Sequence, residues 1–91
     1  MGSRREEIRQ WLAGNVAAAR KRRRWTQATL AERAEVDLMT VQNVEGARTT
    51  AKVSTLVALA NALGVSADSL LRPRRWTKAP RGRPPKRTPK G

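Results

Sequence analysis

The stretch that decides the fold is residues 26–37, with the sequence TQATLAERAEVD. Thr26 is the expected N-cap of a helix over residues 27–34, because its hydroxyl can accept a bond from a free amide of the first turn. The apolar residues of this helix recur at helical spacing and are Ala28, Leu30, Ala31 and Ala34. Asp37 is in turn the expected N-cap of a second helix over residues 38–45. Two short helices therefore follow one another across a brief turn.

A longer helix is predicted before this stretch. Ser3 and Glu6 form a capping box at its start. The helix is expected to end within residues 20–24, where bases suit the negative end of the helix dipole. Its apolar residues fall at helical spacing and are Ile8, Trp11, Leu12, Val16 and Ala19.

The remaining segments complete an all-α prediction. After residues 38–45 we expect a loop over residues 48–53, a helix over residues 55–63 and a short helical turn over residues 67–71. The caps and stops that delimit these segments are Gly46, Ser54, Gly64 and Ser66. The residues expected to face inward from them are Val41, Val44, Leu56, Val57, Leu59, Ala60 and Leu63. No stretch alternates like a strand, so the predicted fold class is all-α with five short helices.

The charge indicates the class of partner. The chain has 20 Lys and Arg against 7 Asp and Glu, a formal net charge of +13, which implies a polyanionic partner: DNA, RNA or acidic lipid. It has no Cys and no His, which excludes disulfides, the usual zinc sites and thiol or imidazole catalysis. We therefore expect no enzyme, no metal and no cofactor. No apolar run approaches the ~20 residues of a membrane span, and a cytoplasmic protein of the nucleoid is expected.

Composition changes after the last predicted helix. Residues 72–91 hold nine of the positive charges, no acid and all five prolines. Low hydrophobicity combined with high net charge predicts disorder. Trp76 is the only large apolar residue in this part. The chain is therefore divided into a helical body over residues 1–71 and a disordered basic tail over residues 72–91.

Residues 26–37 resemble the helix-turn-helix of the lambda-repressor/Cro-like family, also called the XRE family. The agreement runs in register from about residue 12 to residue 71. It includes Leu12, Val16, Arg20, Val41, Val44, Glu45 and the stretches 55–65 and 68–71. The resemblance implies a DNA-binding domain whose helix over residues 38–45 enters the major groove. In this fold Ala31 lets the two helices approach closely and Val36 fills the turn.

The same resemblance implies the DNA contacts. Gln27 would contact a backbone phosphate at the start of its helix, where free amides favour an anion. The base contacts would come from the exposed face of the recognition helix, formed by Leu38, Met39, Thr40, Gln42 and Asn43. Of these, Gln42 and Asn43 can pair bidentately with adenine. Phosphate contacts from the following loop would come from Arg48, Thr49 and Lys52.

The chain departs from the family pattern in several positions. Asp37 replaces the usual serine or threonine cap, and Ala47 lies where a glycine is usual. Leu38 and Met39 lie where polar side chains are common, which predicts weak or A/T-leaning base discrimination. The alternative is that these two residues bury against a protein partner. The basic residues 21–24 are either a solvated helix end or an additional phosphate contact.

Two charged residues of the body are expected to pair. The family often joins a first-helix arginine to the glutamate that ends the recognition helix, and here these are Arg20 and Glu45. We predict a partly buried ion pair. In the alternative, Arg20 contacts a phosphate.

The tail contains the segment PRGRPPK at residues 80–86, which resembles the AT-hook. Gly82 lacks a Cβ, so the backbone can lie on the floor of a narrow groove while Arg81 and Arg83 extend along it. The prolines that follow keep the chain extended. The residues assigned to this minor-groove contact are Arg81, Gly82, Arg83, Pro84, Lys86 and Arg87. The alternative is a tail that acts through charge alone.

The combined prediction is a transcriptional regulator or nucleoid-associated protein that binds double-stranded, A/T-rich DNA. Two alternatives stay open: an antitoxin that regulates its own toxin–antitoxin pair, and an RNA-binding protein. A homodimer through Trp11 or through Leu70 and Leu71 is also open.

Overall fold

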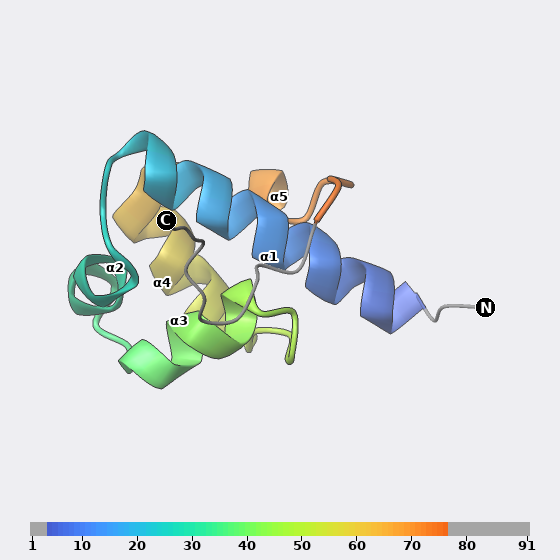
Figure 1. The fold of residues 1–91 in the computed structure, drawn as a ribbon, viewed down its shortest axis with the longest axis horizontal. Coiled ribbons are helices and arrows are strands. Elements are labelled where there is room, and N and C mark those ends of the chain that lie inside the picture. Colours follow the sequence, from blue (N-terminus) through green and yellow to red (C-terminus); the bar gives the residue numbers. More distant parts are fainter. Residues whose placement is uncertain (1–3, 77–91) are drawn as a thin grey trace, which may run out of the picture.

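The computed structural model describes residues 4–76, which form five α-helices (Figure 1). These are α1 (Arg4–Arg22), α2 (Gln27–Ala34), α3 (Leu38–Glu45), α4 (Val53–Leu63) and α5 (Ala67–Leu70). No strand occurs among the described residues, and the all-α prediction is confirmed. Ser3 of the predicted capping box and the AT-hook-like segment at residues 80–86 lie outside the described residues.

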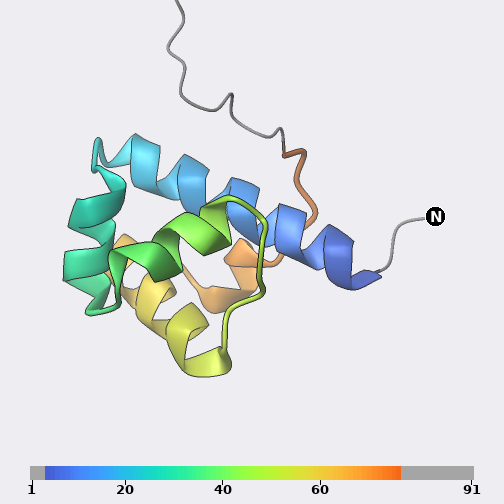
Figure 2. The ribbon, with the colours of Figure 1, turned by 60° about the horizontal axis from the view of Figure 1, so that its bottom comes forward.

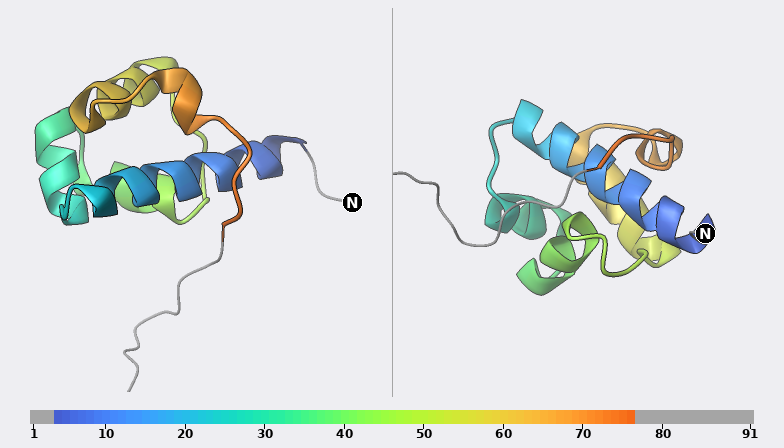
Figure 3. Two further views of the ribbon diagram at one scale, coloured as in Figure 1. Left: turned by 90° about the horizontal axis from the view of Figure 1, so that it is seen from above. Right: turned by 45° about the vertical axis from the view of Figure 1, so that its right-hand side comes forward.

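The helices enclose one core. α1 and α3 pack side by side, α4 and α5 lie across the core from them, and α2 closes one end (Figure 2, Figure 3). Every helix contributes to the core, whose largest fully buried side chains are Leu12, Val16, Leu30, Val41, Val44, Leu59, Leu63 and Leu70. Burying such a side chain stabilises the fold by about 1.5–3 kcal/mol. α2 and α3 are therefore held at a fixed angle by apolar packing.

The predicted start of α4 is wrong. α4 begins at Val53, and Lys52 rather than Ser54 is its N-cap residue, without a side-chain cap bond. The first turn is closed by the backbone, since the amide of Leu56 donates to the carbonyl of Lys52 at 2.8 Å. The loop after α3 accordingly ends at Lys52, and not at Val53.

Two residues predicted to face inward are exposed instead. Val57 is 43% exposed, because the inward stripe of α4 follows Leu56, Leu59 and Leu63 and the next residue along a helix is turned by about 100°. Ala28 is exposed for the same reason, since α2 buries its face through Leu30, Ala31 and Ala34.

The predicted N-caps differ in how they act. The hydroxyl of Thr26 accepts from the amide of Thr29 at 3.0 Å, and that of Ser66 accepts from the amide of Ser69 at 3.1 Å. Asp37 lies at the N-cap of α3 but its side chain makes no cap bond. The carboxylate at this position is exposed, so it contributes negative charge beside α3 without closing its first turn.

Each of the helices α1 to α4 is followed, within two residues, by a residue in the left-handed conformation. These are Arg24 (φ 61°), Glu35 (φ 59°), Ala47 (φ 56°) and Gly64 (φ 72°). α3 stops at the predicted Gly46, which is its C-cap residue with a φ of −86°, and the left-handed residue is the next one, Ala47. The amide of Arg48 donates to the carbonyl of Asn43 at 3.0 Å and that of Ala47 to the carbonyl of Val44 at 3.1 Å. This bonding is that of a Schellman motif, in which glycine is the preferred left-handed residue.

Residues 72–76, which we name the strap, pack against the helical body, although the sequence assigned them to the tail. The side-chain amide of Asn15 donates to the carbonyls of Leu70 at 2.9 Å and Arg72 at 2.8 Å. The Nε of Arg74 donates to Oδ1 of Asn15 at 2.8 Å, and the strap crosses α1 at this point (Figure 3). The disordered part predicted from residue 72 therefore does not include the strap.

Replacing Ala47 by glycine should raise the free energy of unfolding by about 0.5–1 kcal/mol, because glycine adopts the left-handed conformation without a Cβ clash. Urea denaturation measures the change as a higher midpoint at an unchanged slope. The matched control is Ala28→Gly, at an exposed position with ordinary helical geometry, which should lower the midpoint. A lower midpoint for both variants would contradict the left-handed assignment of Ala47.

Candidate nucleic-acid interface

The exposed side of α3 carries the residues that the sequence assigned to base contacts. Val41 and Val44 are 0% and 1% exposed and fix the helix to the core, whereas Leu38 and Met39 are 42% and 65% exposed. Gln42 is exposed, and Thr40 and Asn43 are half-buried. Leu38, Met39 and Gln42 are therefore the α3 side chains most open to an external partner. Thr40 and Asn43 lie at the side of the helix that faces the following loop.

An ion pair holds the helices that surround this face. The Nε of Arg20 lies 2.7 Å from Oε2 of Glu45, and its Nη2 donates to Oε1 at 2.9 Å. The two side chains are 12% and 6% exposed. Arg20 also donates through Nη1 to the carbonyl of Trp25 at 2.7 Å. The pair thus joins the end of α1, the loop before α2 and the end of α3.

Gln27 belongs to the same network. Its Nε2 donates to Oε1 of Glu45 at 3.0 Å, so its side chain connects the first residue of α2 with the last residue of α3. Gln27 is half-buried, and the phosphate contact assigned to it stays a prediction. The glutamate accepts from both Arg20 and Gln27, and its charge is balanced inside the body.

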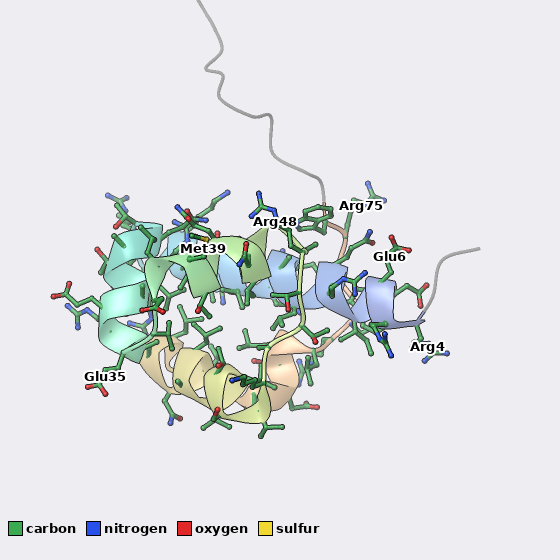
Figure 4. All side chains as sticks on the ribbon, turned by 90° about the horizontal axis from the view of Figure 1, so that it is seen from below. Arg4, Glu6, Glu35, Met39, Arg48 and Arg75 are labelled. Carbon is green, nitrogen blue, oxygen red and sulfur yellow. The ribbon has the colours of Figure 1, made fainter. Side chains whose placement is uncertain are left out.

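The loop after α3 presents its polar residues to solvent. Arg48, Thr49 and Lys52 are all exposed. The Nη1 of Arg48 donates to Oδ1 of Asn43 at 3.1 Å, which orients the guanidinium from the side of α3. Met39 and Arg48 project along the same edge of the molecule (Figure 4). One predicted base-contact residue, Met39, and one predicted phosphate-contact residue, Arg48, thus lie along the same edge.

The basic residues 21–24 divide into two groups. Arg23 is part of the fold, since its Nε donates to the carbonyl of Leu63 at 2.9 Å and its guanidinium lies 5.1 Å from the centre of the Trp25 ring. Arg33 lies 5.0 Å from the same ring centre. Lys21, Arg22 and Arg24 are exposed, as is Arg23 despite these contacts, so the basic cluster remains open to a phosphate contact.

The strap adds residues that the sequence prediction missed. Arg74, Arg75 and Trp76 line a groove of about 820 Å³ between α1 and α3, together with Arg48 and Gln42. Two features of the sequence could have pointed to them: a glycine inside a helix, Gly14, and a single tryptophan within the basic tail. A glycine in a helical pattern often marks a close backbone approach.

Residues 4–76 contain neither a candidate metal site nor a helix that could span a membrane. No group of three or more potential metal-ligating side chains occurs in this part of the chain. Its helices also include none with the length and apolar character needed to span a bilayer.

Comparison with known proteins agrees with this geometry. The profile of the helix-turn-helix family matches residues 16–70. Among solved structures, the chain is similar to a hypothetical transcription factor, NHTF, from Neisseria, with 34% sequence identity and a TM-score of 0.71 over 78% of this chain and 82% of that chain. No curated protein matches the chain.

Replacing Glu45 by alanine should lower the free energy of unfolding by about 3–5 kcal/mol, because Arg20 would lose its partner in a largely buried position. Chemical denaturation measures this loss. The control is Glu7→Ala, which removes an exposed carboxylate 3.7 Å from Arg4 and should change stability by no more than about 1 kcal/mol.

The double variant Arg20→Met/Glu45→Met tests whether the loss comes from the unpaired charge, since it should recover part of the lost stability. An unchanged stability in Glu45→Ala would show that the pair contributes nothing to the fold.

Proposed function

Because the chain belongs to the helix-turn-helix family that matches residues 16–70, we propose that it is a transcription regulator with two contacts to double-stranded DNA. α3 would lie in the major groove, and the tail would bind an A/T-rich minor groove. The major-groove contact is proposed from the exposed side chains of α3. The opposite side of this helix is buried in the core, and exposed basic side chains lie in the loop that follows it. The similarity to a hypothetical transcription factor supports the same role.

The major-groove contact combines a few base contacts with several phosphate contacts. Gln42 is exposed and can donate and accept toward adenine. Leu38 and Met39 offer apolar contact to thymine methyl groups. Arg48 and Lys52, which are exposed in the loop after α3, would contact phosphates at the edge of the groove. With so few hydrogen-bonding side chains, base discrimination is weak, which favours a broad-binding, nucleoid-associated role over a single operator.

The minor-groove contact is proposed from the sequence of residues 80–87, which lie outside the described residues. A narrow A/T minor groove has a strong negative potential that attracts arginine. Arg81 follows Trp76 by five residues, and an extended chain of that length reaches about 17 Å. We propose that this length lets the tail enter a neighbouring minor groove.

Two linked contacts raise affinity through effective concentration. Once α3 is bound, the tail searches only the DNA within its reach, so the second contact forms without a further loss of translational freedom. The A/T preference of the tail would then direct a domain that itself discriminates weakly.

Removal of the tail should abolish the A/T preference. Fluorescence anisotropy would compare the full chain with a chain ending at Trp76 on A/T-rich and G/C-rich duplexes of equal length, at two salt concentrations. The full chain should prefer the A/T-rich duplex, and the shortened chain should lose this preference and part of the salt dependence. The control Gly82→Val keeps every charge but adds a branched side chain, so it should keep the salt dependence and lose the preference. An A/T preference that persists in the shortened chain would contradict the minor-groove role.

Substitutions on α3 and its loop should separate base contacts from phosphate contacts. Gln42→Ala should relax discrimination at one base position by about 1–3 kcal/mol. Arg48→Ala should weaken binding to all sequences alike and reduce the salt slope by about 1. Competition binding with duplexes selected from a random pool measures both effects. An unaltered sequence preference in Gln42→Ala would remove this residue from the base contacts.

A further inference from the structure

The strap follows a defined path across the helical body. It leaves α5 and crosses α1 (Figure 2), and the side chain of Trp76 at its end reaches the C-terminal end of α3. Gly14 favours this close crossing, since a Cβ there would lie in tight contact, 3.0 Å from Cδ of Arg74 and 3.2 Å from the carbonyl oxygen of Arg75. Asn15, the next residue of α1, bonds to the strap through both its amide nitrogen and its amide oxygen.

Trp76 fastens the far end of the strap to α3. Its indole Nε1 donates to the backbone carbonyl of Glu45 at 3.2 Å. The carbonyls at a helix C-terminus have no partner within the helix. Those of Gln42, Asn43 and Val44 accept from the amides of Gly46, Arg48 and Ala47 respectively. The indole therefore completes the end of α3 and sets the position of the strap relative to that helix.

The groove enclosed by α1, α3 and the strap is strongly basic. The bases that line it are Arg20, Lys21, Arg48, Arg74 and Arg75. Its one acidic residue is Glu45, whose carboxylate already accepts from Arg20 and Gln27. The groove therefore has an excess of positive charge, and two of its positive side chains, Arg74 and Arg75, belong to the strap. Gln42 of the recognition helix lines the same groove.

We propose that the strap builds a backbone-phosphate site beside the recognition helix, in which Arg74 and Arg75 act together with Arg48. The ligand is the phosphodiester backbone of double-stranded DNA along one wall of the major groove. This inference rests on the proposed function, because it takes the position of the DNA from α3. Trp76 is a positioning residue that holds the two strap arginines at this wall.

The arrangement of the basic side chains favours a DNA strand as the ligand over an isolated anion. Met39, Arg48 and Arg75 project along one edge of the molecule (Figure 4). A helix in the major groove is bordered by phosphates on both sides, since the groove is only about 12 Å wide. Basic side chains that lie beside the recognition helix would therefore contact the DNA strand that borders the groove. Phosphate contacts of this kind fix the register of the helix without selecting a sequence.

The test uses the full chain and a G/C-rich duplex, on which the minor-groove contact contributes least. The variant Arg75→Ala is compared with Arg4→Ala, since Arg4 is 80% exposed and points away from the edge that carries Arg75 (Figure 4). Each variant removes one positive charge. Arg75→Ala should reduce the slope of log K against log salt by about 1, and Arg4→Ala should leave it unchanged.

Two further variants test the positioning role. Trp76→Ala should reduce the slope by at least as much as Arg75→Ala, because it releases both strap arginines, and the double variant should lose no more than Trp76→Ala alone. Gly14→Gln keeps the charge and improves helix propensity, but its side chain occupies the place of Arg74. It should raise the melting temperature of the helical body or leave it unchanged while lowering DNA affinity, a combination that loss of folding does not produce.

The outcomes separate the strap site from the proposed function. Equal effects of Arg75→Ala and Arg4→Ala on the salt slope would show that only total charge matters. An unchanged duplex affinity in Arg75→Ala would remove the strap from the interface. Either of these two results would leave the proposed DNA binding by α3 intact. Weaker binding of Arg75→Ala to single-stranded RNA, with duplex binding unchanged, would overturn the site in favour of RNA. Failure of the full chain to bind any duplex would overturn the proposed function and the strap site together.

Discussion

The arrangement of this domain depends on the bidentate bond between Arg20 and Glu45. The pair joins the end of α1 to the end of α3, and Gln27 adds the start of α2 to the same carboxylate. Each of the three elements contributes to the face that carries the exposed side chains of α3. Apolar packing in the core brings the helices together, but it is not directional. The charged network supplies the direction, because a guanidinium and a carboxylate bond only in a narrow range of geometries.

The local features of the fold could be predicted from the sequence, and the features set by distant residues could not. The bounds of α2 and α3 follow from Thr26, Asp37 and the spacing of their apolar residues. The start of α4 was misplaced because serine is a strong capping residue, whereas the backbone at Lys52 takes the cap position without a side-chain bond. The apolar character of Val57 predicts a core position, but helical geometry places this residue beside the buried stripe. Ala47 takes the left-handed conformation although the glycine is one residue earlier.

The candidate interface likewise has one part that the sequence predicts, the face of α3, and one part that it does not, the strap. The exposed side chains of α3 and the bases of its loop follow from one continuous stretch of sequence. The strap depends on contacts of Asn15 with Arg72 and Arg74, and of Trp76 with Glu45, between residues far apart in the chain. Composition favours disorder for a segment rich in Arg and Pro. Here a few specific hydrogen bonds and one close approach at Gly14 outweigh that tendency for residues 72–76.

The left-handed ends of the helices have a consequence for how long the protein persists in the cell. Arg24, Glu35 and Ala47 hold a Cβ in a conformation that costs roughly 1–2 kcal/mol for each residue. A domain of this size has a total stability of about 5–10 kcal/mol, so these costs are a large share of it. A ligand that binds only the folded state adds about 2.7 kcal/mol at 100 times its dissociation constant. Occupied protein would therefore resist proteolysis far longer than free protein, and the number of DNA sites would itself set how much protein accumulates.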